Sequence, residues 1–114
     1  MINITEHITK TLEPTNFKVY FNSIPTGYDI PDQYITFLEI NANPALEASD
    51  QEFETKRLIQ VNVWSKIDYY QLVEDIKRLM ESAGYERTFE YDAPKQDGDS
   101  HFNKVLRFVF FDEY

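Results

Sequence analysis

A strand pattern that runs directly into a helix pattern, between residues 58 and 84, constrains the fold more than any other feature. Over residues 58–64, β-branched side chains occupy every second position, the period expected of a strand with one buried face. Over about residues 66–83, apolar side chains instead recur every three or four positions, the period of an amphipathic helix. Both apolar faces are buried when such a helix packs on a sheet, so the stretch predicts that arrangement.

Single residues mark the ends of this predicted helix. Ser65 is predicted as its N-cap, and Asp68, three residues later, as a capping-box-like partner that also suits the positive end of a helix. Gly84 is predicted as the C-terminal stop. Trp64 ends the strand just before the cap, where a large side chain commonly packs a helix onto a sheet, and we interpret it as structural.

The rest of the chain supplies a second helix and further strands. Apolar residues recur every four positions over residues 3–12, which predicts a short helix that stops before Pro14. Strand patterns follow at residues 17–22, 34–40, 86–91 and 101–111. We predict that the first two of these pair with each other and that the last two form an antiparallel hairpin. The final strand is apolar on both faces, so we expect it to be central or to have its end covered by another subunit.

Together these elements predict one α+β domain over residues 1–114. It contains an antiparallel or mixed sheet of about five strands, with the 66–83 helix packed on one face and the amino-terminal helix beside it.

Residues 42–57 break every pattern and are predicted to form an acidic loop, the longest of the domain. A structureless loop of this length inside a compact domain is usually functional or disordered. It is therefore either an interaction element or a solvated hairpin tip without a partner. Its candidate contact residues are Glu47, Asp50, Glu52, Phe53, Glu54, Lys56 and Arg57.

Residue types that carry catalysis lack the spacing that such chemistry requires. His7 and His101 lie on separate predicted elements, and the chain contains no cysteine, so no metal site is predicted. The three glycines are dispersed and form no phosphate-binding loop, so no nucleotide or other cofactor is predicted. Acidic pairs such as Glu52 and Glu54 lack the apolar setting that would perturb a carboxyl pKa. We predict no catalytic residue.

The charge and the aromatic residues bear on possible partners. The 20 acidic and 11 basic residues give a formal net charge of -9, which argues against a surface built to neutralise phosphates or anionic lipids. No secretory signal and no apolar run of about 20 residues is visible, so we expect no membrane insertion. Aromatic residues interpreted as core, because they are not interleaved with basic residues, are Phe17, Phe21, Phe37 and Phe89.

Two segments carry a resemblance to a known family. They are residues 61–88, VNVWSKIDYYQLVEDIKRLMESAGYERT, and residues 101–110, HFNKVLRFVF. Their features are a strand ending in an aromatic residue and serine, a helix with paired tyrosines and a late Leu-Met, an Ala-Gly-aromatic stop, and a closing strand with Lys-x-x-Arg-aromatic. With these features the second half of the chain resembles the tail completion proteins of long-tailed bacteriophages and prophages, also called tail terminator or tail-to-head joining proteins. The first forty residues match only in the order of a helix followed by strands.

The resemblance implies a structural virion protein without catalytic activity. It implies a homo-hexameric ring, in some cases formed only on the tail, that stacks on the last ring of tail tube protein and joins the head–tail connector. It also implies assembly in the bacterial cytoplasm and a final position at the head–tail junction. Genomic DNA passes through such a ring, and an acidic wall would repel its phosphates. Residues 42–57 are then expected to contact a neighbouring subunit, the tube or the lumen.

Two other interpretations remain open at this point. One is a different head–tail connector or minor tail protein, which would be a ring subunit with other neighbours. The other, from a different class, is a small soluble regulator that binds a ligand or a protein. A regulator predicts saturable binding by a stable monomer or dimer, whereas a ring subunit predicts assembly at high concentration or on tail tubes.

Overall fold

The computed structural model describes residues 3–48 and 51–113, with side chains described for residues 3–40 and 55–112. The domain is α+β, as predicted, with a five-stranded mixed sheet and two helices. The elements in chain order are α1 (Ile4–Leu12), the 3₁₀ turn η1 (Glu13–Thr15), β1 (Val19–Phe21), β2 (Gln33–Ala48), β3 (Gln51–Ser65), α2 (Tyr70–Ser82), β4 (Glu86–Ala93) and β5 (Phe102–Glu113).

The strands lie in the order β1-β2-β3-β5-β4. The predicted pairing of the first two strands is confirmed and is parallel, which makes the sheet mixed. The predicted hairpin of the last two strands is also confirmed and is antiparallel. Because β5 lies between β3 and β4, its central position accounts for the apolar residues on both of its faces.

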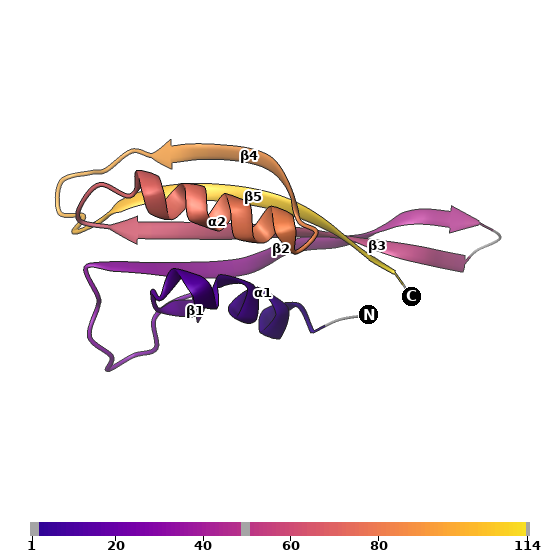
Figure 1. The fold of residues 1–114 in the computed structure, drawn as a ribbon, viewed down its shortest axis with the longest axis horizontal. Coiled ribbons are helices and arrows are strands. Elements are labelled where there is room, and N and C mark those ends of the chain that lie inside the picture. The colour runs from indigo at the N-terminus through magenta and orange to yellow at the C-terminus, as the bar shows by residue number, and fades with distance from the viewer. Residues whose placement is uncertain (1–2, 49–50, 114) are drawn as a thin grey trace.

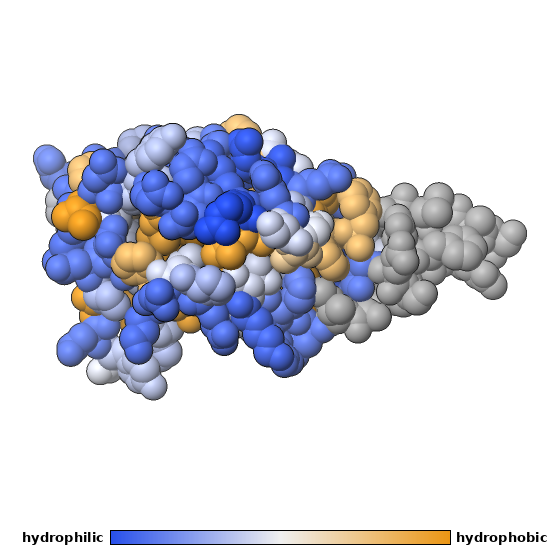
Figure 2. All heavy atoms as spheres, in the orientation of Figure 1, coloured by the Kyte–Doolittle hydropathy of each residue, from blue (hydrophilic) through white to orange (hydrophobic). Residues whose placement is uncertain are grey.

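Both helices pack on one face of the sheet, where they lie in front of the strands in Figure 1. Helix α1 contributes its stripe of Ile4, Ile8 and Leu12 to the core beneath them. The outer surface of this side is largely hydrophilic, with apolar side chains visible at its centre and in smaller patches towards its two ends (Figure 2). Other core residues are Ile35, Phe37, Ile59, Val61, Val63, Leu72, Val73, Ile76, Met80, Tyr85, Leu106 and Phe108.

Helix α2 is shorter than predicted, with 13 residues at 70–82 instead of 66–83. The prediction of one long helix is therefore not confirmed, and α1 has 9 residues. Gly84 ends α2 as predicted, with φ of +99° and its N–H donating to the carbonyl of Glu81 at 3.1 Å.

The N-cap prediction for Ser65 is wrong, because local side-chain hydrogen bonds delay the start of the helix. The Ser65 hydroxyl accepts from the Ile67 N–H at 3.1 Å and donates to the Ile67 carbonyl at 2.7 Å. Asp68 accepts instead from the N–H of Tyr70 at 2.8 Å, at the first residue of α2. Serine and aspartate side chains that bond to nearby backbone in this way compete with helix formation.

The predicted acidic loop at residues 42–57 is also wrong. Strands β2 and β3 pair from Gln33 and Ser65 to Ala48 and Gln51, so this stretch is a β-hairpin. We call residues 41–48 and 51–57 the arm. It projects past the helices along the long axis of the molecule (Figure 1), whose extents are 52 × 26 × 25 Å.

The strand pattern is absent from the arm because its tip has no helix layer beneath it. Alternation of apolar and polar residues arises where one face of a strand is packed on a core. Pro44 is tolerated because β1 pairs only with residues 35–37, so β2 is an edge strand along the arm. Three register irregularities between Glu39 and Glu47 interrupt the same edge, a feature that discourages pairing with unrelated strands.

Glu90 on β4 is the centre of an ion-pair network on the helix side. Its carboxylate lies 2.9 Å from the Lys77 Nζ, 2.5 Å from an Arg87 nitrogen and 3.5 Å from the Lys104 Nζ. Burial raises the Glu90 pKa, but the hydrogen bond from Lys77 and the charges of all three cations outweigh it, so the pKa lies below its ordinary value of 4.5.

A lowered pKa makes Glu90 stabilising above pH 4.5, with that contribution lost as the pH falls through the folded-state pKa. We expect Glu90→Gln to lower the free energy of unfolding at pH 7 by up to about 1 kcal/mol. The difference from wild type should shrink towards pH 3. Urea unfolding at pH 7, 5 and 3 checks this, with the exposed Glu86→Gln as the control. A difference that does not change with pH would contradict the assignment.

Candidate interaction surface

The sheet face opposite the helices is the candidate interaction surface, and we call it the open face. Side chains alternate along each strand, so the neighbours of core residues such as Val61 and Val63 point to the other side. In the described part of the chain, no helix covers that side. The open face comprises Tyr20, Tyr34, Thr36, Leu38, Leu58, Gln60, Asn62, Trp64, Phe89, Tyr91, Asn103, Val105, Arg107, Val109 and Phe111.

Trp64 lies on the open face, so the prediction that it packs the helix onto the sheet is wrong. Val63 takes the helix side, and alternation sends the next residue to the opposite side. The Trp64 ring stacks on Tyr34, with centroids 6.0 Å apart and an interplanar angle of 11°. Its Nε1–H donates to the Thr36 hydroxyl at 2.9 Å. These internal contacts support the structural interpretation of Trp64.

We expect Trp64→Phe to lower the free energy of unfolding by about 1–2 kcal/mol, because the buried Thr36 hydroxyl loses its donor. Thr36→Val removes the acceptor instead. In the double variant the cost should be smaller than the sum of the two single costs, since neither group is left unpaired. Chemical denaturation of all four proteins measures the coupling, and strict additivity would contradict it.

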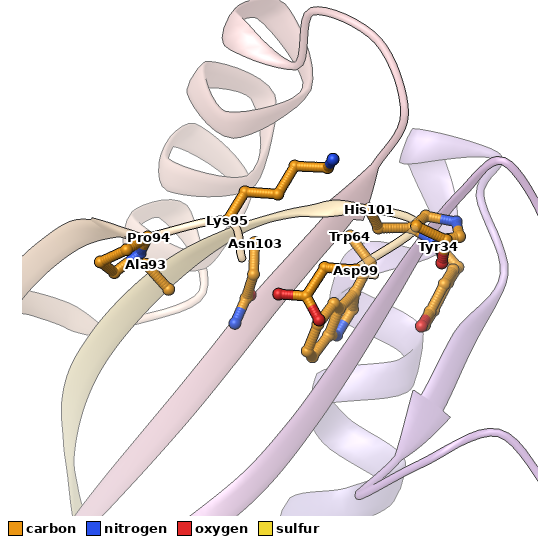
Figure 3. A pocket seen from close by; sticks show the side chains of 9 residues that line it. Tyr34, Trp64, Ala93, Pro94, Lys95, Asp99, His101 and Asn103 are labelled. Atoms are coloured by element: carbon orange, nitrogen blue, oxygen red, sulfur yellow. Dashed lines mark hydrogen bonds between the residues drawn. The ribbon is translucent and has the colours of Figure 1, made fainter. Parts of the chain in front are cut away.

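A hollow of about 340 Å³ lies beside Trp64 and Tyr34 (Figure 3). His101 borders it with both ring nitrogens engaged: Nε2–H donates to the Pro31 carbonyl at 2.8 Å, and Nδ1 accepts from the Ser100 hydroxyl at 2.7 Å. The His101 ring also packs edge-on against Tyr34, 5.4 Å between centroids. The hollow therefore presents no free imidazole, and His101 holds the β4–β5 connection against the sheet.

A second aromatic group lies at the β4 side of the open face, and we call Phe89, Tyr91 and Arg107 the aromatic patch. Phe89 is 50% exposed and Tyr91 is 39% exposed, with their ring centroids 5.4 Å apart. The Arg107 guanidinium lies 5.7 Å from the Phe89 ring centroid, and its Nε donates to the Gln60 amide oxygen at 3.2 Å. A cation this close to the face of an aromatic ring is attracted to it.

The exposed position of Phe89 corrects its interpretation as core, and Phe21, 58% exposed on the edge strand β1, is corrected likewise. Phe37 is buried, as predicted, and Phe17 is partly buried against the core. The alternating pattern correctly predicted that Phe89 lies on a strand. It did not show that this side chain points to the open face instead of the face that the helices cover. Sequence reasoning missed the aromatic patch because the pairing of Arg107 with Phe89 is set by the β4–β5 register.

The contact residues predicted in the arm lie in different environments. The Arg57 guanidinium faces the helix side, where Nε and Nη2 bind both Glu39 oxygens at 2.6 and 2.9 Å and Nη1 binds Asp112 at 2.9 Å. The Glu39 hydrogen bond raises the Arg57 pKa more than burial lowers it. Arg57 therefore ties three strands together at the base of the arm. Lys56 is exposed, opposite Phe111 in register.

Four of the other predicted contact residues lie on the arm. The backbones of Glu47, Glu52, Phe53 and Glu54 belong to the paired strands, whereas Asp50 lies outside the described residues. Among the side chains described for residues 3–40 and 55–112, no group of three or more His, Asp or Glu is arranged to hold a metal ion. No helix within the same ranges is long and apolar enough to cross a membrane.

No protein-family model matches the chain, and no curated protein matches it.

Proposed function

We propose that this protein is a structural subunit of a bacteriophage or prophage tail terminator. Six copies form a ring that ends the tail tube, joins the tail to the head connector and lets genomic DNA pass. The subunit catalyses no reaction. The resemblance of residues 61–88 and 101–110 to tail completion proteins supports this proposal.

The projecting arm is the structural observation that carries the proposal. A subunit of a closed ring needs two different surfaces that fit each other, because each copy contacts its two neighbours through unlike patches. The chain has two such unlike features, an arm that extends beyond the helices and a sheet face without a helix layer. A regulator that acts as a monomer has no comparable need for an arm.

The negative net charge of the chain agrees with a ring through which DNA passes. A net charge of -9 on each subunit multiplies around a ring and repels the phosphates of a passing genome. The final location would be the head–tail junction of the virion, after assembly in the host cytoplasm.

Electron microscopy of an induced lysate tests the proposal after this gene is inactivated. We expect DNA-filled heads separated from tails of irregular length, and normal joined virions when the gene is restored on a plasmid. Unattached tails of normal length would assign the protein to a neighbouring connector instead. Normal virions without the gene would contradict any role in joining, and would favour a binding regulator.

A further inference from the structure

The aromatic patch has the properties of a surface that is covered in an assembly. Two contacting aromatic rings, Phe89 and Tyr91, leave much of their area exposed on the open face. Large adjacent apolar side chains on a sheet typically mark an interaction site. Aromatic residues and arginine are also the types enriched at the centres of protein interfaces.

Arg107 adds an unneutralised charge to this patch. Several other cations on the described surface pair with carboxylates, such as Lys77 and Arg87 with Glu90, whereas Lys18, Lys56 and Lys95 form no ion pair with a described carboxylate. Among the described side chains, Arg107 instead contacts only the Gln60 amide and the Phe89 ring. Its outer guanidinium nitrogens are therefore positioned for a carboxylate from outside. The patch fits a segment that is both acidic and apolar.

The arm of this same chain has that composition. Residues 45–54 read ALEASDQEFE, in which Glu47, Glu52 and Glu54 are acidic and Leu46 and Phe53 are apolar. Residues 54–57 of the arm pair with β5, and the remainder of the arm extends β2 and β3 beyond the end of that pairing. This backbone pairing directs the arm along the sheet and away from the open face of its own copy. A segment of this chemistry reaches the patch only from a second copy.

The dimensions agree with this contact. Residues 41–48 extend for about 26 Å at roughly 3.3 Å per residue, and five strands spaced about 4.8 Å apart make a face roughly 20 Å wide. The β2 edge of the arm is thus longer than such a face is wide, and residues 47, 48 and 51–53 extend past the last β5 pairing at Glu54. An arm that binds a face is a heterologous contact, which repeats around a ring.

We propose that the arm of each copy lies across the open face of the next, with its carboxylates against Arg107 and its apolar residues over Phe89 and Tyr91. This inference rests on the proposed ring function and names its subunit contact. Of the three roles expected for the arm, it selects the neighbouring subunit over the tube and the lumen.

Disulfide trapping tests the contact directly, because the chain contains no cysteine of its own. One variant carries Glu52→Cys on the arm and Tyr91→Cys on the patch, and it is oxidised in tails purified from the phage. We expect a ladder of covalent multimers beyond the dimer on a non-reducing gel. The matched control pairs Glu52→Cys with Arg78→Cys on the exposed side of α2 and should stay monomeric.

Charge reversal gives an independent readout. Arg107→Glu places like charges in contact, so the yield of joined virions should fall about tenfold or more. Adding Glu47→Lys, Glu52→Lys and Glu54→Lys in the same chain should restore most of that yield, whereas the arm changes alone should not. Restoration is not expected if Arg107→Glu merely unfolds the subunit.

The outcomes separate the two proposals. In one outcome, inactivation of the gene gives unjoined heads and tails, while the cysteine variant forms no multimers and the charge reversal is not rescued. That combination would overturn the arm contact and leave the ring function standing. Multimers that stop at the dimer would also overturn it, because they indicate a symmetric pair. Normal virions without the gene would overturn the ring function itself.

Discussion

Replacing Arg57 with methionine is expected to lower the free energy of unfolding by about 3 kcal/mol or more. The guanidinium holds Glu39 through two hydrogen bonds and Asp112 through a third. The Arg57 and Asp112 side chains are only 13% and 4% exposed, so the substitution leaves carboxylate charge in a poorly hydrated position. Removing one partner of a buried ion pair is costly for this reason.

Guanidinium chloride unfolding followed by circular dichroism measures the loss. The informative control is the triple variant Arg57→Met, Glu39→Gln and Asp112→Asn, which removes all three charges together. It should recover a large part of the stability, because no uncompensated charge remains. A single-variant loss below about 1 kcal/mol would show that water reaches the carboxylates and that the cluster does not hold the arm to the sheet.

Replacing Tyr85 with alanine is expected to cost about 4 kcal/mol. Tyr85 is 1% exposed just after α2, and its ring packs against Phe110 and Phe108 with centroids 4.8 and 6.5 Å away. Its hydroxyl lies 2.7 Å from Nδ1 of His7 on α1. The substitution therefore removes a side chain that joins both helices to β5 and leaves a cavity between them.

Tyr85→Phe separates the ring from the hydroxyl and should cost only about 1 kcal/mol. Burial raises the Tyr85 pKa above its ordinary value of 10, so the protonated hydroxyl favours the folded state. This contribution is fully present below pH 10 and is lost as the pH rises towards the folded-state pKa. Thermal unfolding of both variants checks the ranking, and equal losses would show that the ring contributes nothing beyond its hydrogen bond.

The candidate site illustrates how far sequence reasoning reached. The composition of residues 42–57 predicted a loop that is either an interaction element or a solvated hairpin tip. Its form as a paired arm was missed because the backbone ladder, not side-chain alternation, defines it. The guanidinium of Arg57 binds Glu39 and Asp112 of the same chain, which lie 18 and 55 residues away in the sequence. It is therefore not a free contact residue. Such pairings depend on strand order, which local pattern does not specify.

The sequence by itself determined the elements whose side chains repeat with a clear period: α1, the body of α2 and the strands beneath them. For β5 it left two alternatives, a central strand or an end covered by another subunit, and the strand order decided for the central place. Periodicity reports which side chains share a face, because burial selects apolar residues at that spacing. Only the tertiary structure decided which sheet face the helices cover. That choice placed Trp64 and Phe89 on the open face, and strand register placed Arg107 beside Phe89. These outcomes depend on contacts between distant segments, whose free energies no local stretch of residues contains.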